Sequence, residues 1–391
     1  MDRPEQLPRG YATWLLYGVF GCMAFMLNGL GAVLAPLQRE LHVSRGEVAF
    51  YPSLFALGLL VVGLAGGSFV GRIGRARALR VAIAVLVMGG LLIAAPVRIA
   101  TLLGALSIGL GSALLIQLVP ALLAAIHPSA PAARIGEANA LASAASVFAP
   151  LAVSVALAAG LGWRTGYLAP PLVALTVIAW PVLRLALPNA PGSGRDSLSG
   201  TPAPMLGRWV DLLVAVSVEF CMVFWAASAF IAWQHASLSQ APALASLFLV
   251  GMAVARGLSA PIIRRIPDPR VLVLVCTAGA AAGFALFWAA PTLLLAAVGL
   301  LLSGLGVALL YPTTVSRVVA AWPHMPDRAA ARAALGSGIA IGGAPFLLAQ
   351  LSDAIGLRAA FLIVPALLVV LAAHVLIYVE PKSKEFDRRR R

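Results

Sequence analysis

The sequence is divided into twelve long apolar segments by short breaks that contain charged residues, proline or glycine. About 20 apolar residues in a helix span the hydrocarbon core of a bilayer. With 61% hydrophobic and 11% charged residues, the chain has too little polar surface for a water-soluble fold of 391 residues. We therefore expect an all-α integral membrane protein with twelve transmembrane helices. Their approximate ranges are 13–36, 47–70, 78–95, 100–126, 136–160, 166–187, 209–234, 243–263, 270–290, 292–321, 333–355 and 359–379.

The two halves of the chain repeat one another. Residues 109–115, GLGSALL, return 195 positions later as GLGVALL at 304–310, and the Ala-Pro of 149–150 returns at 344–345. We expect an N-terminal six-helix bundle over 1–187, a cytoplasmic linker over 188–208, and a pseudo-symmetric six-helix bundle with a basic cytoplasmic tail over 209–391. Parallel repeats in an apolar chain are typical of transporters that bind substrate between the halves, near the bilayer midplane.

The distribution of basic residues predicts the orientation in the membrane. Of the 28 Lys and Arg residues, 22 lie in the termini and the even-numbered loops, which we expect on the cytoplasmic side. Arg256 lies inside an apolar segment. The net charge of +14 therefore reflects topology, and we expect no nucleic-acid partner. We predict a multi-pass protein of a bacterial-type inner (plasma) membrane with both termini cytoplasmic. The five basic residues expected outside are Arg39, Arg45, Arg98, Arg164 and Arg358.

Twelve segments arranged as six plus six around a polar linker resemble the major facilitator superfamily over essentially the whole chain. That family usually carries G-x-x-x-D-R-x-G-R after the second helix, and here residues 67–75 read GSFVGRIGR. Gly71 replaces the acidic residue. We expect Gly67 and Gly71 to allow close helix packing, Gly74 to form a tight turn, and Arg72 and Arg75 to lie at a helix C-terminus. The resemblance implies a gating loop; topology signals and lipid-headgroup contacts are the alternative.

Two motifs of proton-coupled drug exporters in the same superfamily are missing. The fourth helix of those exporters usually has an arginine four residues before a glycine, but Ala105 precedes Gly109 and Ser107 precedes Gly111. The G-P-x-x-G-G pattern of the fifth helix is replaced by APLAVS at 149–154. Drug–proton exchange therefore loses support but stays open as an alternative.

Two ionisable residues lie deep inside apolar segments of the second half. Glu219 is near the middle of segment 209–234, and Arg256 lies at a similar depth in segment 243–263. Because charge inside a bilayer is costly, such residues usually face a partner or a water-filled cavity. Arg256 could bind a carboxylate or another small oxyanion, while Glu219 competes for it and accepts a proton when substrate arrives. The alternative is a permanent ion pair that joins two helices.

Arg256 and Tyr311 also match transporters similar to the oxalate/formate exchangers and the monocarboxylate carriers. In those families an arginine of the eighth helix binds the substrate carboxylate, and aromatic residues of the tenth helix help to enclose it. Neither Asn28 nor residues 335–348 supplies the second cation often found there, so we favour a monoanion over a dicarboxylate. Asn28 and Gln117 are further candidates for hydrogen bonds to substrate, although polar side chains also join neighbouring helices.

We therefore predict a secondary transporter that moves a small, monocarboxylate-like organic anion by alternating access, with Glu219 as the candidate for proton coupling. Its partners would be the substrate, protons and the lipid bilayer, and a monomer would suffice. Efflux of hydrophobic or cationic compounds is the main alternative. The sequence contains no metal-ligand pattern, hydrolase motif or phosphate-binding loop, so we expect no cofactor, no metal and no enzymatic activity. A membrane sensor or enzyme without flux is the remote alternative.

Overall fold

The computed structural model describes residues 10–184, 203–321 and 326–378, and these residues form helices and short connections without strands. The first half contains α1 (Tyr11–Leu41), α2 (Arg45–Val48), α3 (Phe50–Ile73), α4 (Arg75–Ala94), α5 (Arg98–Ile126), α6 (Pro131–Ala158) and α7 (Trp163–Arg184). The second half contains α8 (Ala203–Gln234), α9 (Gln240–Gly257), α10 (Ser259–Arg265), α11 (Pro269–Ala289), α12 (Leu293–Val307), α13 (Leu310–Ala320), α14 (Pro326–Ile355), α15 (Leu357–Ala360) and α16 (Ile363–Ile377).

The helices confirm the predicted class of an all-α membrane protein. Within the described residues, eleven helical stretches are long and apolar enough to cross a membrane, and α7, with 22 residues, occupies the remaining predicted segment. Helix α8 begins at Ala203, so the predicted linker ends earlier than residue 208. The rest of that linker from residue 188 to 202, and the basic tail from residue 379, lie outside the described residues.

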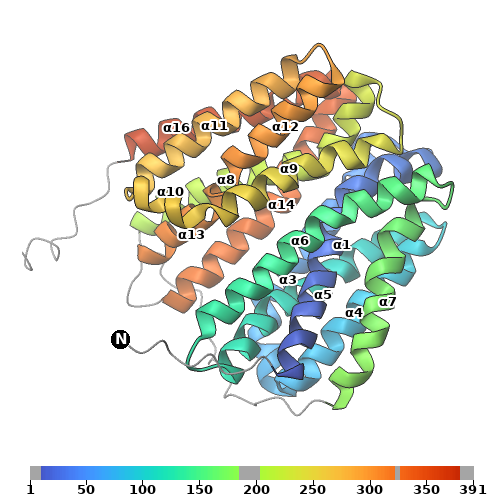
Figure 1. Cartoon of the computed structure of the whole chain (residues 1–391), viewed down its shortest axis with the longest axis vertical. Coiled ribbons are helices and arrows are strands. Elements are labelled where there is room, and N and C mark those ends of the chain that lie inside the picture. Colours follow the sequence, from blue (N-terminus) through green and yellow to red (C-terminus); the bar gives the residue numbers. More distant parts are fainter. Residues whose placement is uncertain (1–9, 185–202, 322–325, 379–391) are drawn as a thin grey trace, which may run out of the picture.

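The two halves lie side by side with a pseudo-symmetric set of contacts (Figure 1). The second span of the first half, α3, packs against the fifth span of the second half, α14. The reciprocal contact joins α6, the fifth span of the first half, to α9, the second span of the second half. Helices α1 and α8, the first spans of the two halves, also contact one another. The repeat in the sequence is therefore a repeat in how the halves meet.

The repeated glycine motif makes the same close contact in each half. A Cβ atom added at Gly109 of α5 would overlap the carbonyl oxygen of Phe55 in α3. A Cβ atom added at Gly304 of α12 would overlap the carbonyl oxygen of Phe248 in α9. Close backbone approach at small residues is a common way for transmembrane helices to associate. The duplicated sequence thus encodes a duplicated helix crossing.

Two spans that were expected to be continuous are broken. The segment 243–263 divides at Leu258 into α9 and α10, and the segment 292–321 divides at positions 308–309 into α12 and α13. Proline in a helix removes the hydrogen bond to the carbonyl four residues earlier and clashes with that carbonyl. Pro261 and Pro312 lie four residues after Gly257 and Ala308, which explains why each helix opens at this point.

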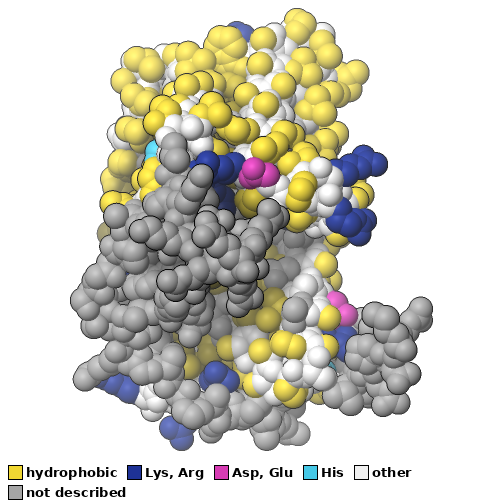
Figure 2. Space-filling view, turned by 90° about the vertical axis from the view of Figure 1, so that its left-hand side faces the viewer, with side chains coloured by type: hydrophobic (Ala, Val, Ile, Leu, Met, Phe, Trp, Pro, Cys, Tyr) yellow, Lys and Arg dark blue, Asp and Glu magenta, His cyan; other side chains and the backbone are white. Residues whose placement is uncertain are grey.

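The bundle has two chemically different ends. Helix α1 begins and α16 ends on one face, which we call the terminal face; the turn between α3 and α4 and helix α10 also lie there. Figure 2 looks onto the left-hand side of Figure 1 and shows Lys and Arg side chains in its middle and lower parts, below a predominantly hydrophobic surface. This pattern suits a bundle with apolar lipid-facing sides and a basic end.

Candidate functional site

A cavity of about 800 Å³ lies between the two halves of the molecule. Helices α1, α3, α5 and α6 line one side, and α8, α9, α10, α11, α13 and α14 line the other. Its lining continues to Ile266 and Pro267 in the connection between α10 and α11, which belongs to the terminal face. The cavity therefore leads from the middle of the bundle toward that face.

Contacts between the halves close the opposite end. The backbone N–H of Gly46 in α2 donates to the carboxylate of Asp353 in α14 at 2.7 Å. The side-chain amide of Gln350 donates to the carbonyl of Gly46 at 3.1 Å. About two helical turns deeper, the Ser53 hydroxyl donates to the carbonyl of Gly342 at 3.2 Å. The cavity is thus open on one side of the bundle and sealed on the other.

The structure brings Glu219 and Arg256 together in this cavity. Arg256 Nη2 lies 3.4 Å from Glu219 Oε1, and both side chains line the cavity. The Glu219 side chain is 12% exposed and that of Arg256 is 36% exposed. The distance is longer than the 2.7–2.9 Å typical of a charge-assisted N–H···O⁻ bond. The pair is therefore a loose one that a second anion could enter.

The broken helix α12–α13 holds one edge of the Arg256 guanidinium. Arg256 Nε donates to the carbonyl oxygen of Ala308 at 3.2 Å. That carbonyl has no helical donor because position 312, four residues later, is proline and lacks an N–H. Nη1 of Arg256 makes no hydrogen bond with any described residue. The guanidinium is thus oriented by protein on one edge and offers its remaining N–H groups to an acceptor in the cavity.

The other predicted binding residues line the same cavity. Tyr311 lies in the first turn of α13 with 39% of its surface exposed. Asn28 donates to the Ser146 hydroxyl at 2.9 Å, and Gln117 donates to the carbonyl of Val62 at 3.4 Å. The side-chain oxygens of Asn28 and Gln117 have no donor among the described residues. These residues are placed where a ligand could reach them, and their binding roles remain predictions.

Most of the cavity lining is apolar. Within the described lining, Glu219 is the only acidic residue and Arg256 the only basic one. The apolar surface combines side chains of both halves, among them Phe20, Met23, Leu27, Phe220, Leu249 and Met252. Such a cavity can bind an apolar body by burial and orient one charged group through the ion pair.

The predicted gating loop differs from expectation in two respects. Gly74 has φ 83° between α3 and α4, so the tight turn is present. Gly71 and Arg72 lie in the last turn of α3. Arg75, however, begins α4, so its predicted place at a helix C-terminus is wrong, because a single residue separates the two helices. A Cβ atom at Gly67 would meet nothing within 4 Å, so close packing at Gly67 is also wrong.

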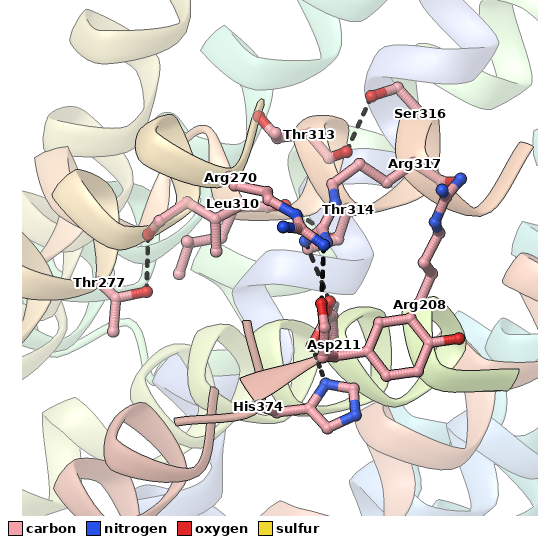
Figure 3. A network of polar contacts seen from close by, with 12 residues as sticks. Arg208, Asp211, Arg270, Thr277, Leu310, Thr313, Thr314, Ser316, Arg317 and His374 are labelled. Carbon is pink, nitrogen blue, oxygen red and sulfur yellow. Dashed lines mark hydrogen bonds and ion pairs between the residues drawn. The ribbon is translucent and has the colours of Figure 1, made fainter. Parts of the chain in front are cut away.

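Sequence reasoning missed a buried polar cluster in the second half (Figure 3). Asp211 of α8 accepts from Arg317 Nη1 of α13 at 3.0 Å and lies 2.6 Å from His374 Nδ1 of α16. Asp211 is 1% and Arg317 4% exposed. The cluster lies outside the central cavity and ties three helices together. An aspartate within an apolar segment was the available signal, but Asp211 lies only two residues from the predicted start of that segment.

A central cavity between two pseudo-symmetric six-helix halves, open at one end and closed at the other, defines a membrane transporter. The family model of the Major Facilitator Superfamily matches residues 15–234 and again residues 213–391. The chain belongs to this superfamily, as the resemblance in its sequence predicted.

Individual relatives agree with this assignment. The uncharacterized transporter YycB of Bacillus subtilis (strain 168) is 30% identical over 181 residues, which span 44% of this chain and 44% of that protein. A bacterial homologue of the human lysosomal transporter Spinster, solved in an inward-facing and unoccupied conformation, has a TM-score of 0.73 at 16% identity, with 96% and 97% of the two chains covered. The nucleoside transporter NupG has a TM-score of 0.75 at 13% identity, with 95% and 100% covered. At these identities the solved structures support the fold alone.

Proposed function

We propose that the protein moves a small organic monoanion through the central cavity by alternating access. The observation that carries the proposal is Arg256, which is oriented by the Ala308 carbonyl, loosely paired with Glu219, and still has Nη1 without an acceptor among the described residues. A planar guanidinium with free N–H groups is well suited to a carboxylate. With one cation among the described lining residues, the cavity favours a single negative charge.

Substrate binding would change the environment of Glu219. A substrate carboxylate on Arg256 competes with Glu219 for the same guanidinium. A buried carboxylate that loses its cation is strongly disfavoured in the charged form, so Glu219 would take up a proton as the anion binds. One anion and one proton would then cross together, which is symport. Tyr311, Asn28 and Gln117 would complete the polar contacts.

Removing Arg256 tests the proposal. In proteoliposomes, we expect Arg256→Ala to lower uptake of a labelled monocarboxylate such as benzoate or butyrate by about tenfold or more. Arg256→Lys keeps the positive charge but loses the planar guanidinium group, so its uptake rate should lie between those of Arg256→Ala and the wild type. Arg264→Ala is the matched control, since Arg264 lies in the adjacent helix α10 and does not line the cavity. Uptake at the wild-type rate by Arg256→Ala, across a panel of mono- and dicarboxylates, would overturn the proposal.

Efflux of a hydrophobic cation is the second candidate, and the apolar lining favours it. Glu219 would then bind the cation, burial would supply most of the affinity, and Arg256 would serve the structure. The two functions differ in which residue is indispensable. If the protein exports cations, Glu219→Gln should abolish the protection of an expressing strain against lipophilic cations, whereas Arg256→Ala should leave that protection intact.

The location and orientation are part of the same proposal. The excess of Lys and Arg in the termini and even-numbered loops supports a cytoplasmic terminal face and a bacterial-type inner membrane. In that orientation the cavity leads to the cytoplasm, and the conformation is the one that releases an imported substrate.

A further inference from the structure

The five arginines expected on the outer side divide into two groups. Three have partners: Arg98 pairs with Glu47 at 2.8 Å, Arg164 pairs with Glu40 at 2.6 Å, and Arg358 donates to the Trp288 carbonyl at 3.1 Å and lies over its ring. The other two, Arg39 and Arg45, make no hydrogen bond or ion pair through their side chains with any described residue. Two unpaired guanidinium groups on one face call for an explanation.

Both unpaired arginines line a second cavity, of about 510 Å³, at the end of the bundle opposite the terminal face. Arg39 and Gln38 come from the last turns of α1, His42 caps that helix, and Arg45 begins α2. Like the arginines, the side chains of Gln38 and His42 have no hydrogen-bond partner among the described residues. The cavity thus gathers hydrogen-bond donors and positive charge, and its described lining contains no carboxylate.

A buried hydroxyl from the other half of the molecule completes this cavity. Ser228 of α8 lines it and is 6% exposed, and its Oγ has no hydrogen-bond partner in the described part of the chain. Buried polar atoms are nearly always satisfied, so an orphaned hydroxyl beside unpaired arginines indicates a missing ligand. The carboxylates that are nearest in sequence, Glu40 and Glu47, are engaged by Arg164 and Arg98.

We propose that this second cavity binds a small oxyanion. A phosphate or carboxylate group would accept hydrogen bonds from Arg39 and Arg45 of the first half and from Ser228 of the second. Such a ligand bridges the two halves at the end that is closed in this conformation. Because a ligand shifts a conformational equilibrium toward the state it binds best, the oxyanion would stabilise closure of this end. The proposal does not depend on which substrate enters the central cavity.

Thermal unfolding of the purified protein in detergent tests the proposal, with inorganic phosphate as the probe and chloride at equal ionic strength as the reference. Phosphate should raise the Tm of the wild type by several degrees, because a ligand that binds only the folded state stabilises it. The rise should be lost in the double variant Arg39→Gln and Arg45→Gln, and reduced in Ser228→Ala. Arg358→Gln is the matched control: it removes one charge from the same face, and because the contacts of Arg358 are with Trp288 and it does not line the cavity, it should keep the full rise.

The group could belong to a free ion or to a phospholipid headgroup. A second arm therefore adds phosphatidylglycerol to the delipidated protein. If the lipid raises Tm through the same residues and removes the effect of phosphate, the oxyanion comes from a headgroup. If phosphate still raises Tm in the presence of the lipid, the bound oxyanion is a free ion. An equal phosphate response in the wild type and the double variant, or no response to either probe, overturns the site.

Discussion

At the scale of single residues, the proposed coupling depends on one carboxylate. Replacing Glu219 by Gln keeps the shape of the side chain but removes its charge and its ability to exchange a proton. In proteoliposomes, we expect Glu219→Gln to lose accumulation of substrate driven by an inwardly directed proton gradient, while exchange of internal for external substrate persists. Glu137→Gln is the control, because Glu137 is held by Arg134 and Tyr17 and does not line the cavity. Proton-driven accumulation that survives in Glu219→Gln would remove Glu219 from the mechanism.

The residue scale also shows what a sequence can predict about such a site. Glu219 and Arg256 could be singled out because a charge inside an apolar span is costly wherever the helix packs. The bond from Arg256 to the Ala308 carbonyl could not, because it depends on a helix opening and on the packing of α9 against α12. Asp211 was missed because charges near helix ends are common and carry little information.

At the scale of helices, the repeated glycines make a quantitative prediction. Gly109→Ala and Gly304→Ala each place a methyl group against a backbone carbonyl, which cannot move aside as a side chain would. Each should therefore destabilise the protein by about 1–3 kcal/mol, seen as a lower Tm in detergent. Gly67→Ala is the control, since its methyl group meets no atom within 4 Å. If Gly109→Ala and Gly67→Ala unfold at the same temperature, the close crossing of α3 and α5 is wrong.

Helix existence was predictable from the sequence, and helix continuity was not. Length and apolar composition identify each span directly, because a helix must be long enough and apolar enough to cross the hydrocarbon core of the bilayer. Pro261 and Pro312 open their helices at Leu258 and Ala308, whereas Pro120 and Pro150 lie inside helices that stay continuous. Whether a proline opens or merely bends a transmembrane helix depends on which neighbours satisfy the freed carbonyl. That information lies in the tertiary contacts.

At the scale of the whole molecule, the duplication accounts for the symmetric contacts between the two halves but not for which end of the molecule is open. The pairing of α3 with α14 and α6 with α9 follows the two-fold symmetry of the repeat. The seal opposite the cavity follows the same symmetry in part: Gln350 of α14 donates to the Gly46 carbonyl, and Ser154 of α6 donates to the carbonyl of Ser239, 193 residues after Gly46. The bond from the Gly46 N–H to Asp353 has no such counterpart among the described residues. Conformation is a balance between states, and no single segment of sequence encodes it.

The closing contact at Gly46 should therefore control which end of the molecule is open. Asp353→Ala removes the acceptor for the Gly46 N–H, and a hydrogen bond at this partly exposed site contributes about 1 kcal/mol to the closed state. The population open at this end should rise roughly fivefold. The measurement is the alkylation rate of a cysteine introduced by Ser53→Cys, at a position beneath the seal; Cys22, Cys221 and Cys276 are buried and give little background.

The matched control for this measurement is Arg358→Ala. Arg358 lies at the same end of the bundle, but its contacts with Trp288 stay within the second half. It should leave the alkylation rate at position 53 unchanged. Asp353→Ala should speed the reaction, and Gly46→Ala should do so as well, because its methyl group would displace the side chains of Asp353 and Gln350. Equal rates in Asp353→Ala and Arg358→Ala would show that this end is held by other contacts, such as those between α1 and α8.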